Sequence, residues 1–230
     1  MNISVIIPAL NEAVRLSATL DRARSVLPQA ELIVADGGSA DDTRCLARAA
    51  GALVVTAPRG RGRQLAAGAE AAHGHLLLFL HADTLLPPDT AEVLARAFAD
   101  DRTQIGSFRL GFDTTGWFLQ SCGWLTRFDS VFTRFGDQGI VVRRDFYGQL
   151  GGFPAWPLFE DVELLRRARR ITRIVSFPAA VTTSSRRFQR GGHLRQQWRN
   201  GWLLCRFLAG ASPHALAAEY AAEPAVAPNP

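Results

Sequence analysis

Apolar stretches with strong β-propensity recur through the first third of the chain, at residues 3–7 (ISVII), 31–35 (ELIVA), 52–56 (ALVVT) and 75–80 (HLLLFL). Between them, Leu16, Leu20, Ala23 and Leu27 repeat at the spacing of one helical face, and residues 43–50 behave similarly. Strands that alternate with helices predict parallel βαβ units. Because the strands are apolar throughout, we expect helices on both faces of the sheet.

The second half of the chain is less regular. The pattern predicts a helix over 90–99, a strand near 105–110, an aromatic segment over 117–135 and a short strand at 139–142. A helix after Asp161, a strand near 172–177 and an arginine-rich stretch follow. No internal repeat or interior linker separates these parts, so we expect a single domain over 1–222. The last residues, 223–230 (EPAVAPNP), have the composition of a disordered tail.

Composition indicates a globular protein, because 47% of the 230 residues are hydrophobic and 20% are charged. The three cysteines lie far apart and form no metal-binding spacing, which favours reduced thiols in the cytoplasm. The N-terminus lacks the basic region of a signal peptide, and no apolar run approaches the ~20 residues of a membrane helix. We therefore expect a soluble protein, or one bound at most to the inner membrane surface.

Charge is distributed unevenly. Residues 166–206 contain eleven arginines and no acid, whereas the remainder has fifteen arginines against twenty-one acids. Such a block favours an anionic partner, which could be phosphate, nucleic acid or lipid headgroups. The alternative is a solvated basic surface.

Polar side chains follow three of the predicted strands at the point where each ends. The sequences are Pro8-Ala9-Leu10-Asn11-Glu12, Asp36-Gly37-Gly38-Ser39 and His81-Ala82-Asp83. In a parallel sheet these ends share one edge, where ligands bind. The alternative for Asn11, and for Ser39 with Asp42, is helix capping. Hard oxygen ligands favour Mg²⁺ or Mn²⁺ over zinc.

Two further motifs carry candidate chemistry. Glu160 and Asp161 open a predicted helix, either as acids that complement its dipole or as a general base beside the pocket. The run RGRGRQLAAG at 59–68 is glycine-rich, but it lacks the Gly-Lys-Ser/Thr end of a P-loop.

Four of these segments in their order, SVIIPALNEA, ELIVADGGSADDT, HADT and FEDVEL, resemble the family 2 glycosyltransferases of the GT-A fold over about residues 3–210. FGDQGIVVRRD (135–145), SSRRFQRGG (184–192) and SPHALAAEY (212–220) are similar to a bacterial branch labelled as radical-SAM- and selenodomain-associated, with some members assigned to arsenosugar biosynthesis. The resemblance implies a Rossmann-like, mostly parallel sheet with helices on both faces. Residues 1–100 would bind the nucleotide sugar and residues 101–222 the acceptor.

The resemblance also implies roles for individual residues. The residues expected to bind the donor are Pro8, Ala9, Asn11, Glu12, Asp36, Gly37, Arg61, Gln64, His81, Ala82 and Asp83. Among them, Asp36, followed by Gly37, would bind the nucleobase. Asp83 would hold a Mn²⁺ or Mg²⁺ ion, with His81 replacing the first acid of the family's metal motif. Asp161, with Glu160 beside it, would be the general base of a direct, inverting displacement.

Other roles rest on position alone. Arg186, Arg187 and Arg190 are candidates for contacts to the diphosphate. His193 is either an additional metal ligand or a surface histidine. Asp137 and Gln138 are either acceptor contacts or a turn. A UDP-sugar is favoured over a GDP-sugar as donor, and the acceptor is either lipid-linked or a small molecule.

Two other classes of protein remain as alternatives. A nucleotidyltransferase would need a basic, glycine-rich loop after the first strand, where this chain has the acidic, glycine-free PALNEA. A nucleic-acid or membrane-surface protein would use the arginines with Phe188, Trp198, Trp202 and Phe207, leaving the strand-end acids unexplained. We therefore expect an enzyme without a nucleic-acid partner and with a peripheral membrane contact as an option. For the stretch around Trp198, the alternative is a helix packed on the core.

Overall fold

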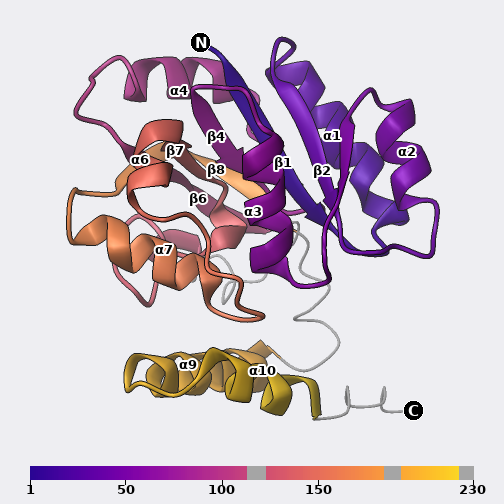
Figure 1. The fold of residues 1–230 in the computed structure, drawn as a ribbon. Coiled ribbons are helices and arrows are strands. Elements are labelled where there is room, and N and C mark those ends of the chain that lie inside the picture. Colours follow the sequence, from indigo (N-terminus) through magenta and orange to yellow (C-terminus); the bar gives the residue numbers. More distant parts are fainter. Residues whose placement is uncertain (113–122, 184–192, 223–230) are drawn as a thin grey trace.

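The computed structural model describes residues 1–112, 123–183 and 193–222 (Figure 1). Eight strands form one sheet in the order β3-β2-β1-β4-β7-β6-β8-β5. The strands are β1 (Ile3–Ala9), β2 (Glu31–Asp36), β3 (Leu53–Thr56), β4 (Leu76–Phe79), β5 (Thr84–Leu85), β6 (Ile105–Phe112), β7 (Ile140–Arg143) and β8 (Val175–Thr183). The fold is thus mixed α/β, as predicted.

The first half follows the predicted βαβ pattern. β1 pairs in parallel with both β2 and β4, and β2 pairs in parallel with β3. The intervening helices are α1 (Ala13–Val26), α2 (Thr43–Ala49) and α3 (Arg61–Ala71), and α4 (Thr90–Ala97) follows β5. The glycine-rich run at 59–68, for which the sequence predicts no element, is helical from Arg61 onward.

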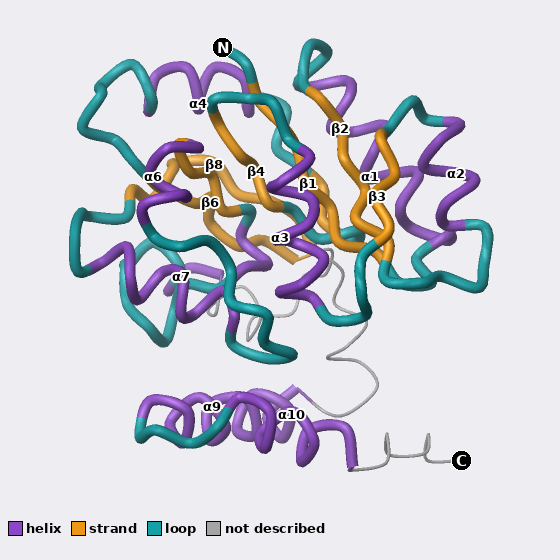
Figure 2. Tube along the Cα trace, in the orientation of Figure 1, coloured by secondary structure: helices purple, strands orange, loops and turns teal. Residues whose placement is uncertain are grey.

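Helices cover both faces of the sheet (Figure 2), and every residue of β1 from Ile3 to Ile7 is buried as a result. Val5 and Ile7 face one core with Leu16 of α1, whereas Ile6 faces the other core with Leu65 of α3. Helix α3 comes very close to the sheet at Gly68, where an added Cβ would lie 2.4 Å from Cγ2 of Ile6. This glycine is therefore required by packing.

The second half adds antiparallel strands. β7 runs antiparallel to β4 and β6, whereas β6 and β8 are parallel. The short elements η1 (Gly136–Gln138) and α6 (Arg144–Gln149) flank β7, and α7 (Glu160–Arg169) precedes β8. The sheet is therefore mostly parallel, as predicted, because β6 and β8 run in the same direction as the first four strands and only β5 and β7 of the described strands run against them.

The strand predicted at 172–177 lies further along the chain. The N–H groups of Ile171 and Thr172 donate to the carbonyl of Ala168, so these residues complete the end of α7. The strand itself begins at Val175 and continues through Pro178, where the register with β6 shifts. Proline has no N–H to donate to a ladder, which is why a strand that contains it is irregular there.

Two helices close the described part of the chain, α9 (His193–Leu208) and α10 (Pro213–Ala222), and both lie beneath the sheet (Figure 1). Leu203, Leu204 and Leu216 pack in one cluster with Phe159 and Val162. Within the described residues no helix is long and apolar enough to cross a membrane. The predicted tail, residues 223–230, lies outside the described residues.

Candidate functional site

The strand order places a switch point between β1 and β4. β2 lies on one side of β1 and β4 on the other, so the connections leave in opposite directions and open a crevice at the carboxyl ends. A cleft that opens to solvent lies there. Its lining residues are Pro8, Ala9, Leu10, Glu12, Arg61, Gln64, His81, Ala82 and Asp83. Most of the residues predicted at the donor are therefore brought together.

Asn11 and Asp36 organise the loops at this edge rather than line the cleft. Asn11 adopts a left-handed conformation (φ 54°), and its Oδ1 accepts the N–H of Ala40 at 2.9 Å. The fully buried carboxylate of Asp36 accepts the N–H groups of Gly38 and Ser39 at 3.0 and 3.1 Å. The capping alternative for Asn11 is wrong, because Glu12 occupies the N-cap of α1.

Gln64 joins the ends of the first two strands. Its amide nitrogen donates to the carbonyls of Ala9 at 2.7 Å and Ala35 at 2.9 Å. A Cβ on Gly37 would come within 3.0 Å of this amide. The absence of a side chain at Gly37 therefore leaves room for the Gln64 amide. Its two hydrogen bonds fix the spacing of β1 and β2 beside the cleft.

A second, smaller pocket adjoins the cleft. Both pockets are lined by Arg61 and His81, and the smaller one also by Glu160 and Asp161 from the start of α7. Arg61 forms an ion pair with the fully buried Glu160 across 99 residues of sequence. The predicted donor residues and the predicted base thus share a continuous site.

Asp161 is held by backbone donors. Its Oδ2 accepts the N–H of Gly136 at 2.6 Å, and its Oδ1 accepts the N–H of Val162 at 2.8 Å. An ionised carboxylate can accept about four hydrogen bonds, so each oxygen keeps a lone pair for a further donor. The residue is 5% exposed and lies against the small pocket. Its position is therefore fixed while its basic oxygens remain available.

The charges at this site are strongly coupled. Burial raises the pKa of Glu160, with Arg61 opposing and Asp161 reinforcing the shift. Burial also raises the pKa of Asp137 to about 6, again reinforced by Asp161 and opposed by Arg61. For Arg61, burial would lower the pKa, but Glu160, Asp161 and Asp137 together raise it above its ordinary value. One arginine thus attracts three carboxyls that repel one another, and it only partly offsets their repulsion.

The two predicted acceptor contacts have different surroundings. Asp137 interacts with Asp161 and Asp83 electrostatically, and its buried Oδ1 has no hydrogen-bond partner among the described residues. Gln138 is fully buried and its amide nitrogen donates to the carbonyl of Thr133 at 2.6 Å. Gln138 therefore belongs to the scaffold beneath the site, and neither Asp137 nor Gln138 is among the residues that line the two pockets.

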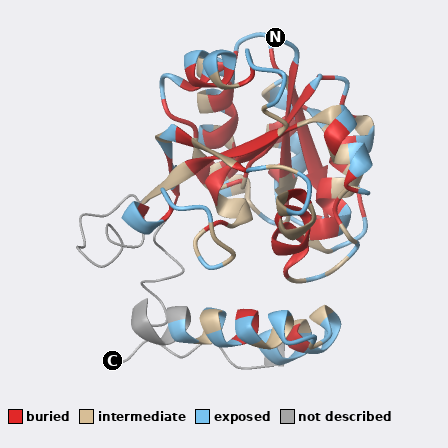
Figure 3. Ribbon diagram, turned by 90° about the vertical axis from the view of Figure 1, so that its left-hand side faces the viewer, coloured by how far each residue is buried: buried red, intermediate tan, exposed pale blue. Residues whose placement is uncertain are grey.

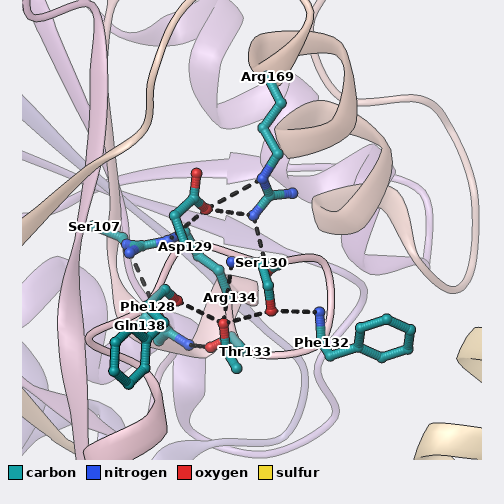
Figure 4. Close-up of polar contacts among 9 residues, drawn as sticks. All are labelled: Ser107, Phe128, Asp129, Ser130, Phe132, Thr133, Arg134, Gln138 and Arg169. Carbon is teal, nitrogen blue, oxygen red and sulfur yellow. Dashed lines mark hydrogen bonds and ion pairs between the residues drawn. The ribbon is translucent and has the colours of Figure 1, made fainter.

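That scaffold is a polar cluster (Figure 4). The fully buried Arg134 pairs with Asp129 at 3.1 Å and donates to Ser107 of β6. Arg169, at the end of α7, donates to the same carboxylate at 2.7 Å. The cluster fixes the segment that leads to Gly136. Nothing in the sequence pattern marks Arg134 as buried, because its partners come from other parts of the chain.

The metal prediction rests on Asp83. Within the described part of the chain, no three His, Cys, Asp or Glu side chains are placed to hold a metal ion together. Mg²⁺ is often bound by one or two carboxylates plus phosphates of the substrate, and Asp83 in the cleft fits that mode. Arg186, Arg187 and Arg190 lie outside the described residues, and so does the side chain of His193.

A sheet with a switch-point cleft, a carboxylate after β4 and buried acids at the start of α7 defines an α/β protein of the GT-A type. The model of the Glycosyl transferase family 2 matches residues 4–153, so the chain belongs to that family. Over 96 residues it is 34% identical to glucosyl-3-phosphoglycerate synthase of Mycobacterium tuberculosis (strain CDC 1551 / Oshkosh). That match covers 37% of this chain and 30% of the relative, so it spans less than a third of the relative's length.

Solved structures agree on the fold. S. aureus TarS 1-349 in complex with UDP-GlcNAc superposes with a TM-score of 0.65 at 16% identity, covering 80% of this chain and 58% of that one. Glucosyl-3-phosphoglycerate synthase from Mycobacterium tuberculosis, in complex with Mn²⁺, UDP and glucosyl-3-phosphoglycerate, gives a TM-score of 0.56 at 23% identity, with coverages of 78% and 71%. The predicted GT-A fold is thereby confirmed.

Proposed function

We propose that the protein is a glycosyltransferase that moves a sugar from a nucleoside diphosphate to an acceptor hydroxyl with inversion. One observation carries the proposal. The buried, backbone-held Asp161 lies in a pocket that shares Arg61 and His81 with the switch-point cleft. A nucleotide in the cleft would therefore present its sugar to a fixed carboxylate.

In the proposed reaction, the acceptor oxygen forms a bond to C1 of the sugar while the bond from C1 to the diphosphate breaks. Asp161 accepts the hydroxyl proton at whichever oxygen has its free lone pair towards the acceptor. The bonding pair leaves with the diphosphate. Attack from the face opposite the leaving group inverts the anomeric centre.

The proposal includes a divalent metal ion held by Asp83 and by the diphosphate. When bound, Mn²⁺ or Mg²⁺ neutralises the negative charge that develops on the leaving group. Glucosyl-3-phosphoglycerate synthase is described with Mn²⁺ and UDP, which supports this ion and a UDP-sugar donor. TarS is described with UDP-GlcNAc, which supports the same nucleotide.

On the acceptor side, we propose Asp137 as a hydrogen-bond acceptor for the incoming molecule. The support is its unpartnered Oδ1 and its electrostatic coupling to Asp161. Arg61 stays paired with Glu160 and partly offsets the repulsion between the acids around this pocket.

Donor binding is tested by thermal melting with UDP, GDP, CDP or TDP, each with and without Mn²⁺. A nucleotide at ~100 times its dissociation constant should stabilise the fold by about 2.7 kcal/mol. We expect UDP to act only with metal and Asp83→Asn to remove the shift. Asp21→Asn, on the exposed side of α1, is the matched control and should leave it unchanged. Equal shifts for Asp83→Asn and the native chain would contradict the metal site.

The role of Asp161 is tested with Asp161→Asn. We expect this variant to keep the UDP- and metal-dependent thermal shift and to lose release of UDP from a UDP-sugar, because only proton transfer is removed. Loss of ~10²-fold or more is typical for removal of a general base. Undiminished turnover in Asp161→Asn would reject the assignment.

A further inference from the structure

The outward face of α9 carries two exposed tryptophans. Trp198 is 76% exposed and Trp202, one helical turn later, is 55% exposed. Leu203 and Leu204 are buried in the cluster on the opposite side of the helix. Both sides of α9 are therefore apolar, and only one of them is covered within the described part of the chain (Figure 3).

Basic and aromatic groups line the edge of this surface. Arg199 donates to the carbonyl of Tyr220 at 2.7 Å, and its guanidinium lies 4.5 Å from the centre of the Tyr220 ring. Arg206 pairs with Glu219 at 2.6 Å. These contacts fix α10 alongside α9, and the tryptophans project from a braced helix pair.

The charge of the helix pair is predominantly positive. Helix α9 carries three arginines (Arg195, Arg199 and Arg206) and no acid, against the single acid Glu219 in α10. A surface of this kind attracts anions and repels a second copy of itself. Tryptophan is the residue that prefers the headgroup level of a bilayer, and arginine binds anionic headgroups there.

We propose that the Trp198–Trp202 face of α9 docks on an anionic membrane surface. The tryptophan rings enter the headgroup region, and the arginines of α9 bind the lipid phosphates. The projecting pair of rings suits a bilayer, into which side chains insert, and the charge favours anionic over zwitterionic lipid.

Docking in this way would bring the candidate site near the lipid. Phe207, on the inner side of α9, stacks on Phe159 with ring centres 4.9 Å apart and contacts Trp156 at 6.0 Å. The neighbouring residues Phe153, Glu160 and Asp161 line the small pocket. The thickness of α9, a diameter on the order of 10 Å, separates the residues beside the small pocket from the docking face.

The test is co-sedimentation of the full chain with vesicles of phosphatidylglycerol and phosphatidylcholine, compared with phosphatidylcholine alone. The variant is Trp198→Ser with Trp202→Ser, and the matched control is Val14→Ser with Ile171→Ser, which are 90% and 63% exposed elsewhere. We expect binding to anionic vesicles only, weakened by salt, reduced at least tenfold in the tryptophan variant and unchanged in the control.

Several results would overturn the proposal. These are absence of binding to the anionic vesicles, equal binding by the tryptophan variant, and binding to both vesicle types alike. A dimer in sedimentation analysis that the tryptophan variant loses would assign the face to a second copy instead. Single-stranded RNA binding that depends on the tryptophans would assign it to nucleic acid. The measurement uses no nucleotide sugar, so its failure and that of the proposed transferase activity are distinguishable.

Discussion

Replacing Asp137 by asparagine should stabilise the fold at neutral pH. Burial, with the charge of Asp161, raises the pKa of this carboxyl from its ordinary 3.8 to about 6. The folded state therefore holds the proton more tightly than the unfolded state does. Below pH 3.8 the group is protonated in both states, and the cost of its ionisation is absent. As the pH rises through 6, the cost develops fully.

The size of the effect follows from the shift. A difference of about two pKa units corresponds to about 3 kcal/mol of lost stability above pH 6, since each unit is worth about 1.4 kcal/mol. Asparagine is neutral at every pH and avoids this cost. For a chain of this size, about 3 kcal/mol should raise the melting temperature by about 6–12 °C.

The assay is urea unfolding of the native chain and Asp137→Asn at pH 4, 5, 6 and 7. The variant's advantage should be below about 1 kcal/mol at pH 4 and grow to about 3 kcal/mol at pH 7. Asp21→Asn is the control and should show no such growth. A pH-independent difference, or a variant less stable at pH 7, would refute the reasoning. Transferase activity should fall in the same variant. The ionised carboxylate is costly to bury, but the proposed acceptor contact needs it, so the change that stabilises the fold also removes the contact.

Two further predictions concern packing and buried charge. Gly68→Ala should destabilise the fold by about 1–3 kcal/mol in the same urea titration, because the new methyl group would lie 2.4 Å from Ile6. The control Gly148→Ala, with open space around it, should be neutral or stabilising. Arg134→Ala should cost about 3 kcal/mol, because it removes a fully buried arginine from its ion pair with the partly exposed Asp129. Arg102→Ala, at an ion pair on the surface, should change stability by less than about 0.5 kcal/mol. Equal losses in the two variants would contradict the cluster's role.

The sequence alone determined the first half of the fold and the edge at which the cleft lies. Apolar runs with helical segments between them can form only a few arrangements, and parallel strands bring their carboxyl ends to one edge. For this reason the sequence alone places His81 and Asp83 beside Pro8. The same argument does not extend past residue 100, where strand directions mix.

Tertiary structure decided the rest. The pairing of Arg61 with Glu160 joins residues 99 positions apart, and no local pattern encodes it. Gln138 follows Asp137 directly, and its amide bonds with Thr133 and Ser107 in the cluster around Arg134, partners that come from other parts of the chain. The burial that raises the pKa of Asp137 and the exposure of Trp198 both depend on which side chains are covered by segments distant in sequence. It is a property of the packed molecule that the order of residues specifies only through the whole fold.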